Sequence, residues 1–142
     1  MRLIPMVIAL VATILVAGCA GDANGAGRPA STEPGIIIIR NRTLLSIREV
    51  TLSQTSGSRS QTFAHISPVP AGSDQVFHRA TKRIPLPRTV TITWNETTRE
   101  THSTDVVVGE LLKETTGLPG EALVFTIGLN RVDATVELTA EN

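Results

Sequence analysis

This 142-residue chain contains three histidines, His65, His78 and His102, which are its clearest candidates for metal ligands. Imidazole nitrogens are common ligands of Zn²⁺. No two of the three have the i, i+2 or i, i+4 spacing that places a ligand pair on one face of a strand or helix. They could bind a metal only by converging from distant parts of the chain. We therefore expect three separate histidines and no metal site, and we keep a site built from all three as the alternative.

His102, Ser103 and Asp105 come closest in the sequence to a hydrolytic triad. Neighbouring residues on a strand point to opposite faces, so the imidazole of His102 and the hydroxyl of Ser103 diverge. The sequence also lacks a G-x-S-x-G motif, a P-loop, a dinucleotide-binding glycine pattern and an H-E-x-x-H motif. We expect a chain that is not an enzyme and has no cofactor. An enzyme would need a pocket that gathers acids such as Glu100, Asp105 and Glu110.

Basic residues are concentrated in the first part of the chain and acidic residues in the last. Residues 40–99 contain nine Lys or Arg and three acidic residues, whereas residues 100–142 contain two Lys or Arg and eight acidic residues. The densest basic group consists of Arg79, Lys82, Arg83 and Arg88. This predicted basic patch could face an anionic lipid or an acidic surface of another protein. The interpretation we favour is that the two parts interleave in one sheet, so that basic and acidic side chains pair across strands.

The overall composition argues against a nucleic-acid partner. The formal net charge is zero, and only 3% of the residues are aromatic. Nucleic-acid-binding domains usually carry a clear basic excess, and those that bind single strands stack bases on aromatic side chains. We therefore expect no nucleic acid among the partners of this chain.

The first nineteen residues have the order of features found in a secretory signal. Arg2 precedes an apolar run over residues 3–17, which is shorter than the roughly 20 residues that span a bilayer. The run ends in Leu15-Val16-Ala17-Gly18-Cys19. This segment resembles the lipobox of bacterial lipoproteins. The resemblance implies that residues 1–18 are a signal peptide, removed before Cys19, and that Cys19 is acylated on its sulfur and on its new amino group.

By this resemblance the chain binds a membrane through acylated Cys19, because two or more acyl chains give a stable anchor. Cys19 is the only cysteine, so it has no disulfide partner within the chain. The next residue is Ala20 and not Asp, which in bacteria with two membranes resembles lipoproteins sorted to the outer membrane. We expect an outer-membrane protein that faces the periplasm, with the inner membrane or the cell surface as alternatives.

The chain after the signal peptide divides into a tether and one domain. Residues 19–35 are rich in Gly, Ala, Pro and Ser and show no periodicity, which is typical of a flexible tether. Residues 36–142 contain short alternating segments and almost no helical periodicity. This pattern predicts an all-β domain, an antiparallel sandwich of about seven strands. It is similar to immunoglobulin-like or transthyretin-like domains in architecture only, so the likeness carries no function.

Particular segments give sharper expectations. Residues 36–39 are four isoleucines, which predicts a strand buried on both faces. Trp94 is in phase with Val90 and Ile92, so we place it in the core and not on a sugar-binding surface. Residues 54–61, QTSGSRSQ, have the composition of a loop.

These observations together predict a lipid-anchored cell-envelope lipoprotein that acts as a non-catalytic binding or structural module. The alternative is a periplasmic accessory factor that binds a ligand or metal through His65, His78 and His102.

Overall fold

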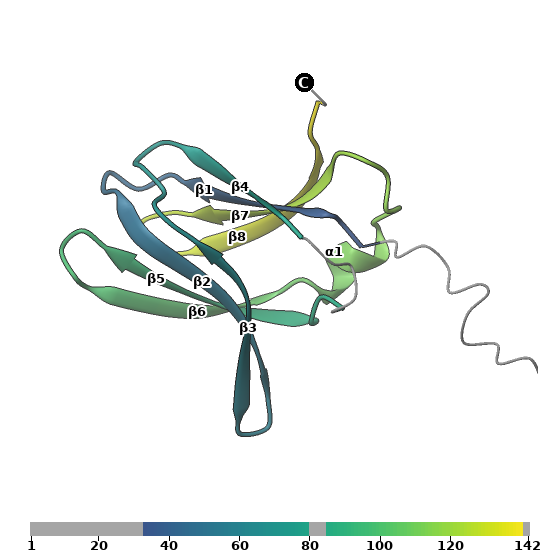
Figure 1. Cartoon of the computed structure of the whole chain (residues 1–142), viewed down its shortest axis with the longest axis horizontal. Coiled ribbons are helices and arrows are strands. Elements are labelled where there is room, and N and C mark those ends of the chain that lie inside the picture. The colour runs from purple at the N-terminus through teal and green to yellow at the C-terminus, as the bar shows by residue number, and fades with distance from the viewer. Residues whose placement is uncertain (1–32, 80–84, 141–142) are drawn as a thin grey trace, which may run out of the picture.

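The computed structural model describes residues 33–79 and 85–140. The predicted signal peptide, Cys19, Lys82 and Arg83 therefore lie outside the described residues, as does most of the predicted tether. The described chain forms eight strands and one short helix (Figure 1). These elements are β1 (Ile36–Asn41), β2 (Ile47–Ser56), β3 (Arg59–Ile66), β4 (Asp74–His78), β5 (Thr89–Glu96), β6 (Thr101–Val107), α1 (Gly109–Lys113), β7 (Glu121–Ile127) and β8 (Val132–Leu138).

The strands form two four-stranded sheets that pack into a sandwich, which confirms the predicted all-β class. The first sheet has the order β4-β1-β7-β8 and the second has the order β3-β2-β5-β6. All neighbours pair antiparallel except β1 and β7, which pair parallel, with Ile36 opposite Ala122 and Asn41 opposite Ile127. The sequence predicted neither this parallel pair nor the strand order.

Alternating side chains from both sheets fill the core. Ile37 and Ile39 of β1 pack with Phe125 of β7 in the main cluster, and each is fully buried. Ile38 points to the opposite face and is also buried, beside Val124. The isoleucine run is thus buried on both faces, as predicted. Burying each such side chain contributes about 1.5–3 kcal/mol, so this strand is a major source of stability.

Trp94 lies in the core of the second sheet, as its spacing predicts. It belongs to the main cluster with Val90 and Ile92 and is 8% exposed. Its position near the end of β5 places its ring at the edge of the core, next to the turn that follows.

Residues 54–61 are not the loop that their composition predicted. They form the outer ends of β2 and β3, which pair from Gln54–Gln61 to Ser56–Arg59 around Gly57, whose φ is +61°. The side-chain amides of Gln54 and Gln61 also share a hydrogen bond of 3.0 Å. Figure 1 shows this hairpin projecting from the body of the sandwich. Because both faces meet solvent, the segment has no apolar alternation to mark it as a strand.

The two ends of the sandwich are formed by different segments of the chain. Gly35, α1 and residues 117–120 lie at one end, which we call the tether end because the chain enters there (Figure 1). Residues 42–46, 67–73, 97–100 and 128–131 lie at the opposite end, which we call the loop end. Helices long and apolar enough to cross a membrane are not found among the described residues.

Candidate functional site at the loop end

Asn41 fixes the framework of the loop end. Its side chain is fully buried, and its amide nitrogen donates to the carbonyl oxygens of Leu45 at 2.9 Å, Val69 at 3.0 Å and Pro70 at 3.2 Å. Its amide oxygen accepts hydrogen bonds from the backbone and hydroxyl of Thr43 at 2.9 and 2.8 Å. One side chain therefore joins the loop after β1 to the loop before β4, and the strands beneath hold both loops in place.

A tight turn joins β5 to β6 at this end. Glu96 donates its backbone N–H to the carbonyl of Glu100 at 3.1 Å, and Arg99 donates its own to the carbonyl of Glu96 at 3.0 Å. Arg99 has a φ of +69°, the left-handed conformation that closes a three-residue hairpin loop. The turn thus sets Glu96 and Glu100 directly opposite each other. Like charges in this position destabilise a hairpin.

The same turn places an imidazole beside these two carboxylates. Trp94 pairs with His102 in the register of β5 and β6, so residues 94, 96, 100 and 102 share one face of the hairpin. The Nε2 of His102 lies 3.7 Å from Oε1 of Glu96 and 3.9 Å from Oε2 of Glu100. The side chain of Glu96 is 16% exposed, whereas that of Glu100 is 74% exposed. We call Glu96, Glu100 and His102 the acid–histidine cluster.

The ring of His102 is held against Trp94. The two ring centroids are 5.1 Å apart and the planes are inclined by 21°, which is a stacked arrangement. The Nε2 of His102 is buried, yet it has no hydrogen-bond partner among the described residues. Buried polar atoms are usually paired, so an unpaired one calls for an explanation. Here the orphaned nitrogen belongs to a ring that is fixed in orientation and lies beside two carboxylates.

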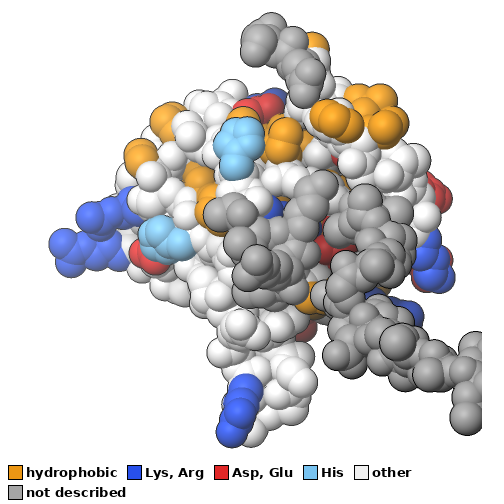
Figure 2. Space-filling view, turned by 45° about the vertical axis from the view of Figure 1, so that its right-hand side comes forward, with side chains coloured by type: hydrophobic (Ala, Val, Ile, Leu, Met, Phe, Trp, Pro, Cys, Tyr) orange, Lys and Arg blue, Asp and Glu red, His pale blue; other side chains and the backbone are white. Residues whose placement is uncertain are grey.

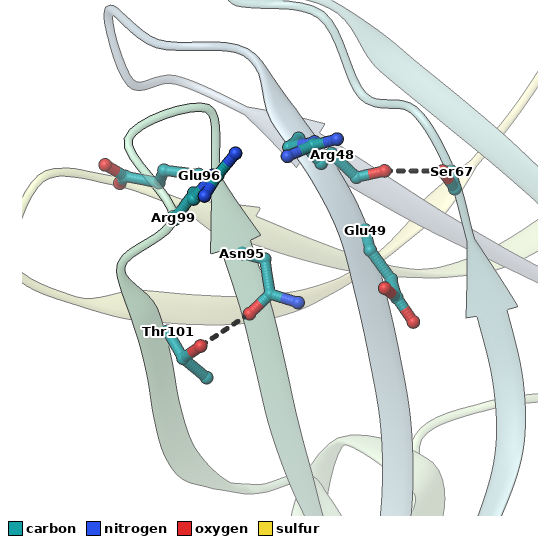
Figure 3. Close-up of a pocket in the computed structure, with 7 residues that line it drawn as sticks. All are labelled: Arg48, Glu49, Ser67, Asn95, Glu96, Arg99 and Thr101. Atoms are coloured by element: carbon teal, nitrogen blue, oxygen red, sulfur yellow. Dashed lines mark hydrogen bonds between the residues drawn. The ribbon is translucent and has the colours of Figure 1, made fainter.

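A polar hollow of about 430 Å³ lies on the other face of the same hairpin (Figure 3). Its lining residues are Arg48, Glu49, Ser67, Asn95, Glu96, Arg99 and Thr101. In Figure 3 the guanidinium groups of Arg48 and Arg99 lie on the same side of the hollow, and the carboxylate of Glu96 points away from it. Within residues 33–79 and 85–140, neither of these arginines has an ion-pair partner. Two such guanidinium groups suit a carboxylate or phosphate.

The described structure does not bring the three histidines together. His65 is on β3 and His102 is on β6, the two outer strands of the second sheet, and His78 is on β4 of the first sheet. Three strand spacings separate β3 from β6, which is about 14 Å and far too wide for a shared metal ion. His65 instead faces Glu49, with 3.2 Å between Nδ1 and Oε1.

The two described members of the predicted basic patch lie at the tether end. The side chain of Arg79 is 6% exposed, and its guanidinium donates to Glu33 at 3.2 Å and to the carbonyl of Pro34 at 2.9 Å. Glu33 also accepts the backbone N–H of Leu86 at 3.1 Å. Arg88 is exposed. Arg79 therefore fixes the segment that enters β1, and of these two side chains only Arg88 presents its charge to solvent.

Basic and acidic side chains pair across the first sheet. Arg40 of β1 binds Glu137 of β8 through two bonds of 2.8 and 3.0 Å, and it binds Asp74 of β4 at 3.0 Å. The bonds to Arg40 hold the pKa of Glu137 below its ordinary value, and the bonds to Glu137 and Asp74 raise the pKa of Arg40. On the face shown in Figure 2, lysine and arginine side chains lie in separate groups. The basic and acidic parts of the chain thus interleave here, which is the interpretation that the sequence favoured.

The acid–histidine cluster was not predicted from the sequence, where His102 was considered only with the other two histidines or with Ser103 and Asp105. The signal was present in residues 94–102, WNETTRETH, which form one hairpin. Two acids flank a three-residue turn, a tryptophan comes two residues before the first acid, and a histidine comes two residues after the second. An exact register was needed to see that these side chains share a face.

No protein-family model, curated protein or solved structure matches this chain. The similarity to immunoglobulin-like and transthyretin-like domains therefore remains one of architecture, two packed sheets.

Proposed function

We propose that this chain is a lipid-anchored lipoprotein of the bacterial cell envelope that acts as a non-catalytic binding module, with the loop end as its binding surface. The observation that carries the proposal is the separation of the two ends. The chain enters β1 at the tether end, and the framework of loops around Asn41 lies at the opposite end. An anchor at Cys19 would leave the loop end directed away from the membrane.

The surface chemistry of the loop end supports a binding role. Leu44 is 86% exposed and Leu129 is 77% exposed, and both lie in loops at this end. The backbone N–H of Arg42, at the start of the first loop, donates to the carbonyl of Ile127, the residue before the second loop. Exposed apolar side chains and a polar hollow at the same end of a domain are typical of interaction sites. We propose that the partner is another envelope protein that presents an acidic group to Arg48 and Arg99.

The tether end has the charge expected of a surface that faces the membrane. Arg88 is exposed there, and the predicted basic patch includes Lys82 and Arg83, which belong to the undescribed segment. We propose that this patch faces anionic lipid, because each basic residue near such a surface contributes about 1 kcal/mol of attraction. The outer membrane, on its periplasmic side, is the proposed location, with the inner membrane and the cell surface as alternatives. The alternative function, a metal-binding factor that uses His65, His78 and His102, gains no support from their separation.

The anchor is tested by intact mass and membrane fractionation of the wild-type chain beside Cys19→Ala, expressed in a bacterium that processes lipoproteins. Ser31→Ala, in the predicted tether, is the matched control. We expect a wild-type mass that begins at Cys19 with added lipid, recovered with membranes. Cys19→Ala should lose both properties and Ser31→Ala neither. A full-length, unmodified wild-type chain would overturn the proposed anchor.

The assignment of the two ends is tested with a photo-crosslinking residue placed at Leu44 or at Arg88. We expect the probe at Leu44 to capture protein and the probe at Arg88 to capture phospholipid. Capture of phospholipid from Leu44, with none from Arg88, would reverse the proposed orientation.

A further inference from the structure

We propose that the acid–histidine cluster is a binding site for a divalent transition-metal ion, with Zn²⁺ as the best fit. The three ligands are one carboxylate oxygen each from Glu96 and Glu100 and the Nε2 of His102. This inference does not depend on the lipid anchor or on the partner proposed above, since it rests only on the hairpin of β5 and β6.

The distances between the donor atoms match a small metal site. The three ligand atoms all lie within 4.8 Å of one another. The distance from Nε2 of His102 is 3.7 Å to the oxygen of Glu96 and 3.9 Å to the oxygen of Glu100. Tetrahedral zinc with bonds of about 2.0–2.2 Å separates its ligands by about 3.4 Å. The two distances to Nε2 would therefore need to close by a few tenths of an ångström, and the two carboxylate oxygens, which lie within 4.8 Å of each other, by up to about 1.4 Å. The exposed side chain of Glu100 is free to rotate.

The electrostatics of the hairpin favour a cation. Glu96 and Glu100 face each other across the closing pair of the turn, and Glu96 is largely shielded from solvent. A divalent ion between them would convert repulsion into attraction. The nearest described basic side chains of this turn and of β2, Arg99 and Arg48, line the hollow on the other face, and the carboxylate of Glu96 points away from them (Figure 3).

The orphaned nitrogen of His102 is an independent observation. Nε2 is buried without a hydrogen-bond partner among the described residues, although its ring is fixed by the stack on Trp94. A metal bond would use its lone pair and remove the cost of leaving a buried polar atom unpaired. The mixed nitrogen and oxygen donor set favours Zn²⁺ over Mg²⁺ or Ca²⁺, which prefer oxygen alone.

Three protein ligands leave at least one coordination position open. Glu100 is 74% exposed and the imidazole of His102 is 37% exposed, so that position faces solvent at the loop end. A water molecule or an acidic group of a partner could complete the coordination. We assign binding to this site and no reaction.

The test is a titration of the untagged, full-length chain in detergent with ZnCl₂, after treatment with a chelator. Calorimetry gives the stoichiometry, and the fluorescence of Trp94, the only tryptophan of the chain and in contact with His102, reports the site. We expect one ion per chain and a saturable change in Trp94 emission, with little effect of millimolar Mg²⁺ or Ca²⁺.

Two variants and a matched control locate the ion. Glu100→Gln changes an exposed side chain that the fold does not need, and His102→Phe keeps a ring against Trp94. The control is His65→Phe, which removes the histidine facing Glu49 on the opposite edge of the sheet, where no second acid completes a cluster among the described residues. Losing a ligand should weaken Zn²⁺ binding at least about tenfold, because losing even a supporting hydrogen bond weakens metal sites by about 10–100-fold.

Absence of saturable binding to the wild-type chain would overturn the proposal. So would binding that Glu100→Gln leaves unchanged, or that His65→Phe weakens as much as Glu100→Gln does. Equal competition by Ca²⁺ would overturn the choice of metal. Should His102→Phe fail to fold, Glu100→Gln and the control still decide the result.

Discussion

Each end of this sandwich contains a glutamate shielded from solvent, and the two carboxylates differ in whether hydrogen-bond donors surround them. At the tether end Glu121 is 6% exposed, and its carboxylate accepts the backbone N–H groups of Thr116 at 3.0 Å and Gly117 at 2.7 Å as well as the hydroxyl of Thr116 at 2.9 Å. At the loop end Glu96 faces a second carboxylate and the buried, unpaired nitrogen of His102. The first arrangement is complete without a ligand, and the second is completed by one.

This contrast separates structural from functional polar groups. The hydrogen bonds from Thr116 are the main reason that the pKa of Glu121 lies below its ordinary value. The charged carboxylate organises the loop between α1 and β7, and every donor that it binds comes from that loop. Partly satisfied polar groups cost stability, and proteins keep them mainly where they serve a function.

Asn41→Ala should have the largest effect, because the buried side chain of Asn41 joins the loop after β1 to the loop before β4. The substitution leaves three carbonyl oxygens without their buried donor. We expect the free energy of unfolding to fall by about 3 kcal/mol, measured by urea denaturation. Asn130→Ala, on an exposed turn at the same end, is the control and should change it by less than about 0.5 kcal/mol. A small loss for Asn41→Ala would mean that the loops are not held as described.

Glu121→Gln should have the next largest effect. The amide cannot replace a carboxylate that accepts several hydrogen bonds, so we expect Tm at pH 7 to fall by about 5 °C. Because the pKa of Glu121 is lower in the folded chain, its contribution to stability is complete above the ordinary glutamate pKa of about 4.3 and is lost as the pH falls through the folded value. The difference between wild type and variant should therefore shrink in acid.

Thermal unfolding at a series of pH values checks this prediction. Glu110→Gln is the matched control, since Glu110 is 83% exposed and pairs only with Lys113 among the described residues. It should leave Tm nearly unchanged. A Tm difference for Glu121→Gln that grows as the pH falls would show that the charged carboxylate does not stabilise the tether end.

Glu100→Gln should have the smallest effect, and its sign should be opposite. Without metal, the change removes one of two like charges that face each other across a turn. We expect the free energy of unfolding to stay constant or to rise by up to about 0.5 kcal/mol in the presence of a chelator. A loss of more than about 1 kcal/mol would mean that Glu100 stabilises the fold as Glu121 does, and the contrast between the two ends would fail.

The sequence predicts the layers of this molecule better than its pairings. Alternation marks the strands and places Trp94 in the core, because burial on one face leaves a local pattern. The parallel pair β1–β7 depends on contacts between segments about 85 positions apart, for which there is no local signal. The hairpin over residues 54–61 is polar on both faces, so its composition resembles that of a loop.

The candidate site was harder to predict than the fold for a related reason. Its geometry depends on the register of one hairpin, and a shift by a single residue would turn Glu96 to the other face of the sheet. Arg79 shows the same limit. Its place in a basic segment made it a member of the predicted basic patch, but the side chain turns inward to Glu33. Sequence reveals which residues are charged, whereas the partners of those charges depend on the strand order.

The most direct test of the contrast between the two ends is a two-dimensional NMR spectrum of the ¹⁵N-labelled full-length chain, recorded before and after one equivalent of Zn²⁺. We predict that shifts in amide signals concentrate in residues 94–102, around the acid–histidine cluster, and that the amides of Thr116 and Gly117, which bind Glu121, do not move. Shifts centred on the loop around Glu121, or no shifts at all, would contradict the account.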